Sequence, residues 1–512
     1  MTTPRRARTA WSSWRGSRLS IITSEICVSR VLSSVSWLFF GQVGRIASQL
    51  VGVSVIARLL TPADFGVIAI ALMVSNLAGL LRDMGTGPAA IRSPDGSARF
   101  LGGIYSVQLV IGLILAAALL LLAQPLASFY RVDALERVLI IFSVVFPLSA
   151  LGGVHLIVLE RAQRYRDISA IDLLAYVGGL LVAVALASAG IGVESLAAQA
   201  VVSAALQTIL QRRAAGMVLR PTHPRHARSA AGGSLAVTSF HLMNYVVRNS
   251  DTGVAGRLAS ADFVGAYSMA GRIAQMPTQL IGMLVSRVSV PMLSAEGLDR
   301  DTLAHNAQRM IAGTLLASAL VCLVLVALRQ TVTALLFGAQ WLDSVPPQLV
   351  WLLPAAALTS TSAVVVGVMT AFGATVALTR TGVLSAIAHA LALLAGLSVD
   401  VRWLPASILA SALMALGIAL LQLRAVQADR AMSPVRLMPL VPVVLLLVAC
   451  ALWSDTLLLA AAGSDPVRPI GLELLEAGAV ALLLSALAAG QWRAWGRRPT
   501  LDPESASERK TA

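Results

Sequence analysis

The sequence predicts an all-α polytopic membrane protein of about 14 transmembrane helices, and three observations support this class. Hydrophobic residues make up 57% of the 512 residues, charged residues make up only 12%, and the mean hydropathy is +0.80. The apolar residues form continuous runs of about 20, the length that a helix needs to cross a bilayer. A β-barrel would alternate every second residue, and a soluble helical enzyme would need charged outer faces that these runs lack.

The runs fall into two groups of six, followed by two more. The first six predicted spans lie near residues 34–57, 66–90, 101–123, 137–159, 168–190 and 193–211. The second six lie near 233–256, 263–288, 307–328, 347–370, 376–397 and 403–423. The last two lie near 437–454 and 471–491. We therefore expect a cytoplasmic basic tail (1–30), an N-terminal six-helix bundle (31–211), a cytoplasmic basic linker (212–231), a C-terminal six-helix bundle (232–424), two additional helices (436–492) and a cytoplasmic tail (493–512).

The two groups of six are related in sequence. At an offset of 199 residues, four polar positions coincide: Gln42 with His241, Arg45 with Asn244, Gln49 with Arg248, and Arg58 with Arg257. After a one-residue gap, Ala-Asp-Phe at 63–65 coincides with Ala-Asp-Phe at 261–263. The pattern indicates two halves in the same orientation.

The net charge of +14 comes mainly from arginine in short loops between apolar runs. With an even number of spans, 28 basic residues fall on one side and seven on the other. By the positive-inside rule, this asymmetry predicts both termini in the cytoplasm and explains the charge without nucleic-acid binding. Three distant cysteines indicate neither a disulfide framework nor a metal site, and no nucleotide-binding loop or other cofactor motif is present.

Four arginines lie well inside predicted spans, away from their ends, on the first two helices of each half: Arg45, Arg82, Arg248 and Arg272. Each would cost roughly 2.5–3.5 kcal/mol at a lipid-exposed helix centre. Helical spacing gathers other polar residues beside them, which predicts a water-filled, positively charged cavity between the halves. A guanidinium matches the geometry of phosphate, so we expect a phosphate-bearing cargo. The predicted ligands are Arg45, Arg248, Arg272, Gln42, Gln49, Asn244 and Gln275.

Some of these charges have a structural alternative. Arg248 has Asp251 one turn away and Arg82 adjoins Asp83, so both pairs are candidate ion pairs or coupling groups. Asp172 and Glu194 fit either a coupled cation or ordinary charges at helix ends. The lone histidines His155 and His389 fit hydrogen-bonded packing better than proton relays. Trp341 and Trp403, near span ends, are interpreted as interfacial anchors.

The repeated Ala-Asp-Phe element is interpreted as structural. Thr61 is placed as an N-cap, with Pro62 at the first helical position and Asp64 at the third. Ser260 is expected to have the same role in the second half. Arg58 and Arg257 are expected to pair with the acids of these turns.

The segments ARLLTPADFGVIAIA and RDMGTGPAAI, together with residues 244–291, resemble the oligosaccharide flippase family of polysaccharide biosynthesis proteins, in the multidrug/oligosaccharidyl-lipid/polysaccharide superfamily. The similarity is greatest to exporters of colanic-acid type. The resemblance implies a V-shaped, MATE-like pair of six-helix bundles with two extra helices. It also implies translocation of an undecaprenyl-pyrophosphate-linked oligosaccharide, with arginines in a cationic central cavity.

The expected partners are this polyprenyl-linked oligosaccharide, membrane lipid, and a polysaccharide polymerase with export components, in a bacterial cytoplasmic membrane. One alternative is a cation-coupled multidrug or metabolite antiporter of the same fold, which would favour carboxylates inside the membrane. The other alternative is a polysaccharide polymerase. Such an enzyme would need a larger folded outer loop than this chain has, because each predicted outer loop contains at most about twenty residues.

Overall fold

The computed structural model describes residues 48–83, 90–91, 93, 97–216, 220–227, 234–293, 300–429 and 441–449. The structure describes only the backbone, and not the side chains, at residues 83, 234–241, 280–281, 283–293 and 300–301. Met1–Gly52 and Val53–Ala512 form separate compact units, and the contacts below lie within the second. Every secondary-structure element among the described residues is a helix and none is a β-strand, so the predicted all-α class is confirmed. Eight described helices are long and apolar enough to cross a membrane, and the total of fourteen stays a prediction.

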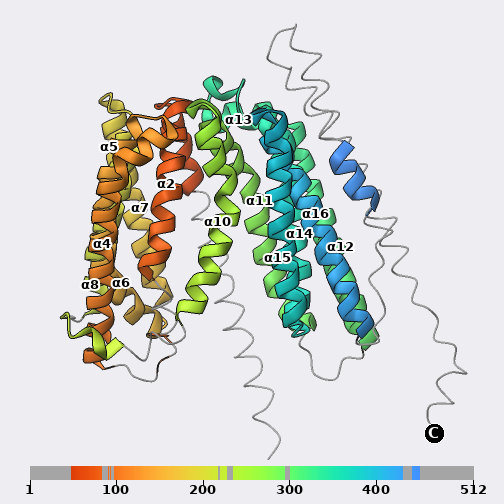
Figure 1. The fold of residues 1–512 in the computed structure, drawn as a ribbon, viewed down its shortest axis with the longest axis horizontal. Coiled ribbons are helices and arrows are strands. Elements are labelled where there is room, and N and C mark those ends of the chain that lie inside the picture. Colours follow the sequence, from red (N-terminus) through yellow and green to blue (C-terminus); the bar gives the residue numbers. More distant parts are fainter. Residues whose placement is uncertain are drawn as a thin grey trace, which may run out of the picture. The chain divides into compact units, whose positions relative to one another are not determined.

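The helices of the first half lie together (Figure 1). After the helix Ser48–Ala57 they are α2 (Pro62–Asp83), α4 (Ala98–Tyr130), α5 (Ala134–Ser143), α6 (Val145–Arg161), α7 (Tyr165–Ser188) and α8 (Glu194–Ala215). α6 packs against both α4 and α8, and α8 packs closely against α7. Gly179 permits the last contact, because a Cβ atom there would lie 2.7 Å from the Gln199 carbonyl oxygen.

The predicted span 137–159 is divided in the structure into α5 and α6. The division falls at Val144, and α6 then continues through Pro147. Proline has no N–H group to donate to the carbonyl four residues earlier, here that of Ser143, so the helical ladder is interrupted at this point. By contrast, α4 continues past its predicted end, through Pro125, to Tyr130. A membrane helix can lose one hydrogen bond at proline without ending.

The linker between the halves is tied to the first half at residues 220–227. The backbone amide of Thr222 donates to the Gly102 carbonyl at 3.1 Å, and its hydroxyl donates to the Arg99 carbonyl at 2.8 Å. Ser106 donates in turn to the Thr222 carbonyl at 2.6 Å. A Cβ atom at Gly102 would lie 2.6 Å from the Arg220 carbonyl oxygen, so the close fit requires glycine.

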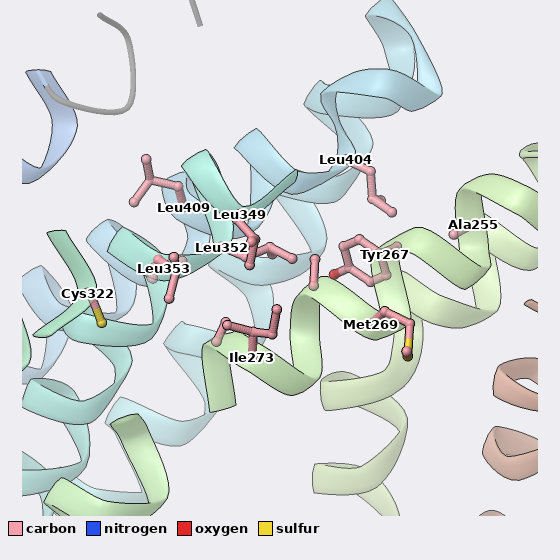
Figure 2. Packing of buried hydrophobic residues seen from close by; sticks show 14 of the residues in the cluster. Ala255, Tyr267, Met269, Ile273, Cys322, Leu349, Leu352, Leu353, Leu404 and Leu409 are labelled. Atoms are coloured by element: carbon pink, nitrogen blue, oxygen red, sulfur yellow. The ribbon is translucent and has the colours of Figure 1, made fainter. Parts of the chain in front are cut away.

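The second half is organised around α14. Its elements are α10 (Ser234–Leu258), α11 (Ala261–Leu293), α12 (Arg300–Ala327), α13 (Arg329–Phe337), η2 (Ala339–Trp341), α14 (Pro346–Ala371), α15 (Thr375–Val399), η3 (Val401–Trp403) and α16 (Leu404–Asp429), with a further helical segment at 441–449. In the most apolar 18-residue stretch of α14, 72% of the residues are buried, whereas in that of α15 only 17% are. α14 is therefore central and α15 peripheral. Figure 2 shows Leu349, Leu352 and Leu353 of α14 near Ile273 of α11.

α2 and α11 join the two halves, and they carry the repeated sequence. A Cβ atom at Gly66 would lie 1.9 Å from the carbonyl oxygen of Ala261, and one at Gly265 would lie 1.9 Å from that of Pro62. Each helix therefore presents a glycine to the first turn of the other. The contact is reciprocal, as expected for two related halves. Buried side chains of both helices, among them Phe65 and Met269, belong to one hydrophobic core.

Candidate functional site

α10 carries two predicted ligands on its exposed face. The hydroxyl of Tyr245 donates to the Met73 carbonyl of α2 at 2.8 Å, which fixes one side of α10. The backbone of α10 also approaches α2 at Gly253, where an added Cβ atom would lie 3.3 Å from the Met73 sulfur. Asn244 and Arg248 are exposed. Their side chains are therefore not enclosed by the packing of α10 against α2 and remain accessible to a ligand.

α11 presents its predicted polar stripe on its less buried side. Gln275 is exposed and Arg272 is half-buried, whereas Met269 and Ile273 are fully buried. Arg272 interacts electrostatically with Tyr176 of α7, a helix of the first half. The helical periodicity predicted the polar face of α11. The periodicity did not identify Tyr176. In the sequence, Tyr176 differs from its apolar neighbours only by a hydroxyl group, one helical turn after Asp172.

Asp251 is held by groups other than Arg248. The Tyr267 hydroxyl of α11 donates a short hydrogen bond to one carboxylate oxygen, and the backbone amide of Thr252 donates to the other at 2.7 Å. Between Arg248 and Asp251, both of which the structure describes, there is no ion pair. The Asp251 carboxylate is instead held by a buried tyrosine that tertiary packing brings from α11, and a role of Asp251 as a coupling group stays a prediction. Arg248 keeps its charge available for a ligand.

Some of the other predicted site residues lie outside the described part of the chain, and the others lie on helices of the first half. Gln42 and Arg45 lie outside the described residues, and Gln49 is exposed on the helix Ser48–Ala57. Arg82 is half-buried in the last turn of α2, and the side chain of Asp83 lies outside the description, so their pairing stays a prediction. Asp172 is half-buried and accepts a long hydrogen bond, 3.5 Å, from Gln207 of α8.

The repeated turn forms the predicted helix caps. The amide of Thr61 donates to Asp64 Oδ2 at 3.0 Å, and the amide of Asp64 donates to Thr61 Oγ1 at 3.3 Å. In the second half, the amide of Phe263 donates to Ser260 Oγ at 3.3 Å. Both N-caps are confirmed, and each satisfies backbone amides that the first helical turn leaves without intrahelical partners.

The arginines beside these turns have other partners than expected. Arg58 donates to the Leu335 carbonyl at 2.8 Å, and the Arg257 guanidinium lies 5.4 Å from the centre of the Phe129 ring. Such a position over an aromatic face is a cation–π contact. The predicted pairing with the turn acids is therefore wrong, because local spacing did not anticipate partners from distant helices.

Trp341 is fully buried and not an interfacial anchor. Its ring lies 5.3 Å from that of Phe65 and 6.0 Å from that of Phe337, between centroids. Trp403 is 46% exposed, as an anchor would be. Hydropathy places both tryptophans near span ends and cannot distinguish them.

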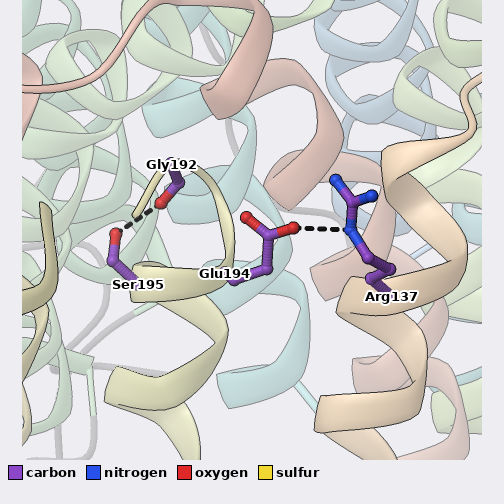
Figure 3. Close-up of polar contacts among 4 residues, drawn as sticks. All are labelled: Arg137, Gly192, Glu194 and Ser195. Carbon is purple, nitrogen blue, oxygen red and sulfur yellow. Dashed lines mark hydrogen bonds and ion pairs between the residues drawn. The ribbon is translucent and has the colours of Figure 1, made fainter. Parts of the chain in front are cut away.

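Glu194, considered for cation coupling, forms an ion pair. Arg137 Nε donates to its carboxylate at 2.7 Å, and in the adjoining turn Ser195 donates to the Gly192 carbonyl, also at 2.7 Å (Figure 3). Because the Arg137 side chain is 68% exposed, the pair contributes little to stability, about 0–1 kcal/mol. In the described part of the chain, no group of three His, Cys, Asp or Glu residues could hold a metal ion.

The fold defines a multi-pass helical membrane protein in which α2 packs against α11, and α10 and α11, of 25 and 33 residues, carry the basic and amide side chains described above. The chain belongs to the family described as polysaccharide biosynthesis protein, which matches residues 55–346.

The chain is similar to several named members of this class. The succinoglycan biosynthesis transport protein ExoT of Rhizobium meliloti (strain 1021) is 27% identical over 329 residues, 62% of this chain and 65% of ExoT. The teichuronic acid biosynthesis protein TuaB of Bacillus subtilis (strain 168) is 22% identical over 62% of this chain and 66% of TuaB. The lipopolysaccharide biosynthesis protein WzxC of Escherichia coli (strain K12) is 22% identical over 62% of this chain and 65% of WzxC. The similarity thus spans just under two thirds of each relative.

The fold is shared with a solved structure, the lipid II flippase MurJ in an inward closed conformation. The TM-score is 0.66 over 90% of this chain and 99% of MurJ, at 11% sequence identity. At this identity the likeness concerns the fold alone.

Proposed function

We propose that this protein is a flippase that moves an undecaprenyl-pyrophosphate-linked oligosaccharide from the inner to the outer leaflet of a bacterial cytoplasmic membrane. The product would serve exopolysaccharide or lipopolysaccharide synthesis. Family membership supports the proposal, as do the names of ExoT and WzxC and the fold of a lipid II flippase.

The observation that carries the proposal is the position of Arg248 and Arg272. Both lie on helices of membrane length: Arg248 is exposed on α10, and Arg272 is half-buried on α11 and interacts electrostatically with Tyr176. A guanidinium offers a planar set of donors that matches pyrophosphate oxygens. The amide groups of Asn244 and Gln275, on the same faces, are suited to sugar hydroxyls or phosphate.

The remaining predicted ligands lie at or near positions of the first half that correspond to the site residues of the second half. Gln42, Arg45 and Gln49 lie on the first predicted span, and we propose that they complete the site from the first half. Transport would follow alternating access, in which the two related halves rock about a site between them. Both termini are proposed to lie in the cytoplasm, and the flipped lipid would pass to a polysaccharide polymerase and export components.

The test replaces Arg45, Arg248 and Arg272 singly with alanine in cells that lack the native protein. Each loss should reduce polymer export about tenfold or more, because a hydrogen bond to a charged group contributes roughly 1.5–3 kcal/mol. Arg380→Ala is the matched control, since Arg380 is exposed on α15, away from the site residues. Full export by all three site variants, at protein levels equal to the control, would overturn the cationic site.

The lipid-linked intermediate distinguishes the alternatives. A flippase defect leaves completed repeat units in the inner leaflet, whereas a polymerase defect leaves single units in the outer leaflet. An antiporter defect changes neither and alters resistance to small cations. A leaflet-specific assay in cells without the protein therefore separates the three functions.

A further inference from the structure

α2 and α10 are neighbouring helices that run in opposite directions (Figure 1). A Cβ atom at Gly256 of α10 would lie 3.0 Å from the Ile70 side chain of α2, and one at Gly253 would lie 3.3 Å from that of Met73. Residue numbers therefore rise along α2 as they fall along α10. One turn further on, this pairing places Asn76 of α2 level with the part of α10 that precedes Gly253 by three residues.

Asn76 is exposed on α2 and meets α10 at Tyr245. The side chain of Asn76 shares a hydrogen bond with the Tyr245 hydroxyl, which also donates to the Met73 carbonyl at 2.8 Å. Because the single hydrogen of this hydroxyl goes to Met73, the hydroxyl accepts from the Asn76 amide. A carboxamide has two N–H donors and an acceptor oxygen, and this bond uses one donor. Asn76 is thus oriented by α10 and has further groups that suit a ligand.

Asn76 and Arg248 lie on the same side of this helix pair. At about 100° per residue, Val246 and Arg248 fall on opposite sides of the stripe of α10 that faces α2. On α2, Leu81 and Asn76 likewise fall on opposite sides of the stripe that faces α10. Because the helices are antiparallel, the exposed apolar residues Val246 and Leu81 share one side, which suits contact with lipid. Asn76 and Arg248, both exposed, share the other side, which suits a polar ligand.

The reciprocal glycine contact makes Asn76 the counterpart of a predicted ligand on α11. Gly66 of α2 meets the first turn of α11, and Gly265 of α11 meets the first turn of α2 in the same way. Ten residues after each glycine there is an exposed amide, Asn76 on α2 and Gln275 on α11. The Ala-Asp-Phe repeat hides this relation, because its spacing pairs Asn76 with Ala274.

The two helices differ in charge beside these amides. Three residues before Gln275 the chain has Arg272, whereas three residues before Asn76 it has Met73. The basic residue of α2, Arg82, is six residues beyond Asn76, about 9 Å along the helix. α2 therefore presents an amide without an adjacent guanidinium. Such a group suits the uncharged hydroxyl or acetamido groups of a sugar better than it suits a phosphate.

We propose that Asn76 is a cargo-binding residue that contacts the sugar next to the pyrophosphate. The inference rests on the proposed function. Arg248 and Arg272 bind the pyrophosphate from the second half, and the Asn76 amide forms a hydrogen bond with the first sugar from α2. Tyr245 is a positioning residue, because its hydroxyl accepts from Asn76 and orients the amide. The cargo is thereby held with its charged end toward α10 and α11 and its first sugar toward α2.

Binding of two lipids that differ only in the sugar tests this contact. The probes are undecaprenyl pyrophosphate and the lipid-linked oligosaccharide extracted from cells that lack the protein, each titrated against full-length protein in lipid nanodiscs. Asn76→Ala should weaken binding of the oligosaccharide lipid about twofold to tenfold, the change expected for one neutral hydrogen bond, and leave binding of undecaprenyl pyrophosphate unchanged. Arg248→Ala should weaken binding of both lipids. Unchanged binding of the oligosaccharide lipid by Asn76→Ala, or an equal loss for both lipids, overturns the sugar contact.

The matched control is Gln124→Ala, since Gln124 is an exposed amide of α4, six residues before the end of that helix. This variant should bind both lipids as the wild type does. Asn76→Leu keeps the approximate shape of the side chain without its hydrogen bonds and suits a membrane helix. It should show the same loss as Asn76→Ala, and it provides the test if the alanine variant unfolds.

Tyr245→Phe tests the positioning role. The amide of Asn76 remains but loses the hydroxyl that orients it, so the ratio of the two dissociation constants should change in the same direction as in Asn76→Ala, by a smaller factor. A loss of helix packing alone would weaken binding of both lipids and leave this ratio unchanged. An unchanged ratio in Tyr245→Phe therefore overturns the positioning role.

The outcomes separate this proposal from the proposed function. If deletion of the protein leaves lipid-linked intermediates and export unchanged, the flippase function fails and the sugar contact fails with it. If export depends on the protein but Asn76→Ala keeps the wild-type ratio of the two dissociation constants, only the assignment of Asn76 is wrong.

Discussion

The indole N–H of Trp341 donates a hydrogen bond of 2.9 Å to the carbonyl oxygen of Ala57, 284 residues earlier in the chain. Gln340, its neighbour, donates to the same carbonyl and to that of Leu60 at 3.1 Å. The Ala57 carbonyl ends the helix Ser48–Ala57, and the Leu60 carbonyl lies in the turn that follows, so no further helical turn satisfies either of them. The second half of the protein therefore caps a helix of the first.

Loss of this cap should destabilise the protein. Trp341→Phe keeps most of the buried ring but removes the donor, and we expect a loss of about 1 kcal/mol in the free energy of unfolding. Trp341→Ala, which also leaves a cavity, should lose about 3–5 kcal/mol. Thermal unfolding of the purified protein measures both. Trp403→Phe is the control and should have little effect, because Trp403 is 46% exposed; equal losses at both positions would contradict the role of the cap.

The glycine contact between α2 and α11 gives a second prediction. Gly66→Ala and Gly265→Ala each place a methyl group 1.9 Å from a backbone oxygen, which cannot move aside as a side chain can. Each should lower the free energy of unfolding by about 1–3 kcal/mol, as overpacking typically does.

The control for the glycine contact is Gly417→Ala in α16, where a Cβ atom meets nothing within 4 Å. This change should be neutral or stabilising, by up to about 1 kcal/mol, because alanine favours the helix more than glycine does. If Gly66→Ala or Gly265→Ala were as stable as Gly417→Ala, the close approach of the two helices would be wrong.

The position of Tyr176 gives a third prediction, which rests on the proposed function. Tyr176→Phe removes only the hydroxyl of the tyrosine that interacts electrostatically with Arg272. If this hydroxyl takes part in the site, export should fall about twofold to tenfold, the range expected for one polar interaction of roughly 0.5–1.5 kcal/mol. Tyr165→Phe on the same helix is the control, since Tyr165 is 54% exposed at the start of α7. Unchanged export by Tyr176→Phe would remove this tyrosine from the site. Thermal unfolding should be the same in both variants.

Helix ends were predictable where local chemistry decides them. Thr61 and Asp64 are three residues apart and cap each other, so their roles follow from sequence spacing alone. The same holds for the polar face of α11, because a period of 3.6 residues places Arg272 and Gln275 on one side.

Partners across the fold were not predictable in this way. The sequence places Asp251 one turn from Arg248, yet its carboxylate accepts from Tyr267 of the next helix. The hydroxyl groups that meet His389 come from positions 139 and 22 residues away. Such choices depend on how the helices pack, and periodicity within one helix contains no information about them.

The contact of Gly66 and Gly265 lies near the starts of α2 and α11. Residues further along α11 are therefore at increasing distances from this contact. Arg272 is eleven residues from Ala261, about 16 Å, whereas Leu293 is about 48 Å away. A tilt of roughly ten degrees about the contact would move Arg272 by about 3 Å and Leu293 by about 8 Å. In the proposed transport, such a tilt would let the far end of α11 make room for a bulky headgroup while Arg272 stays within a few ångströms of the phosphate.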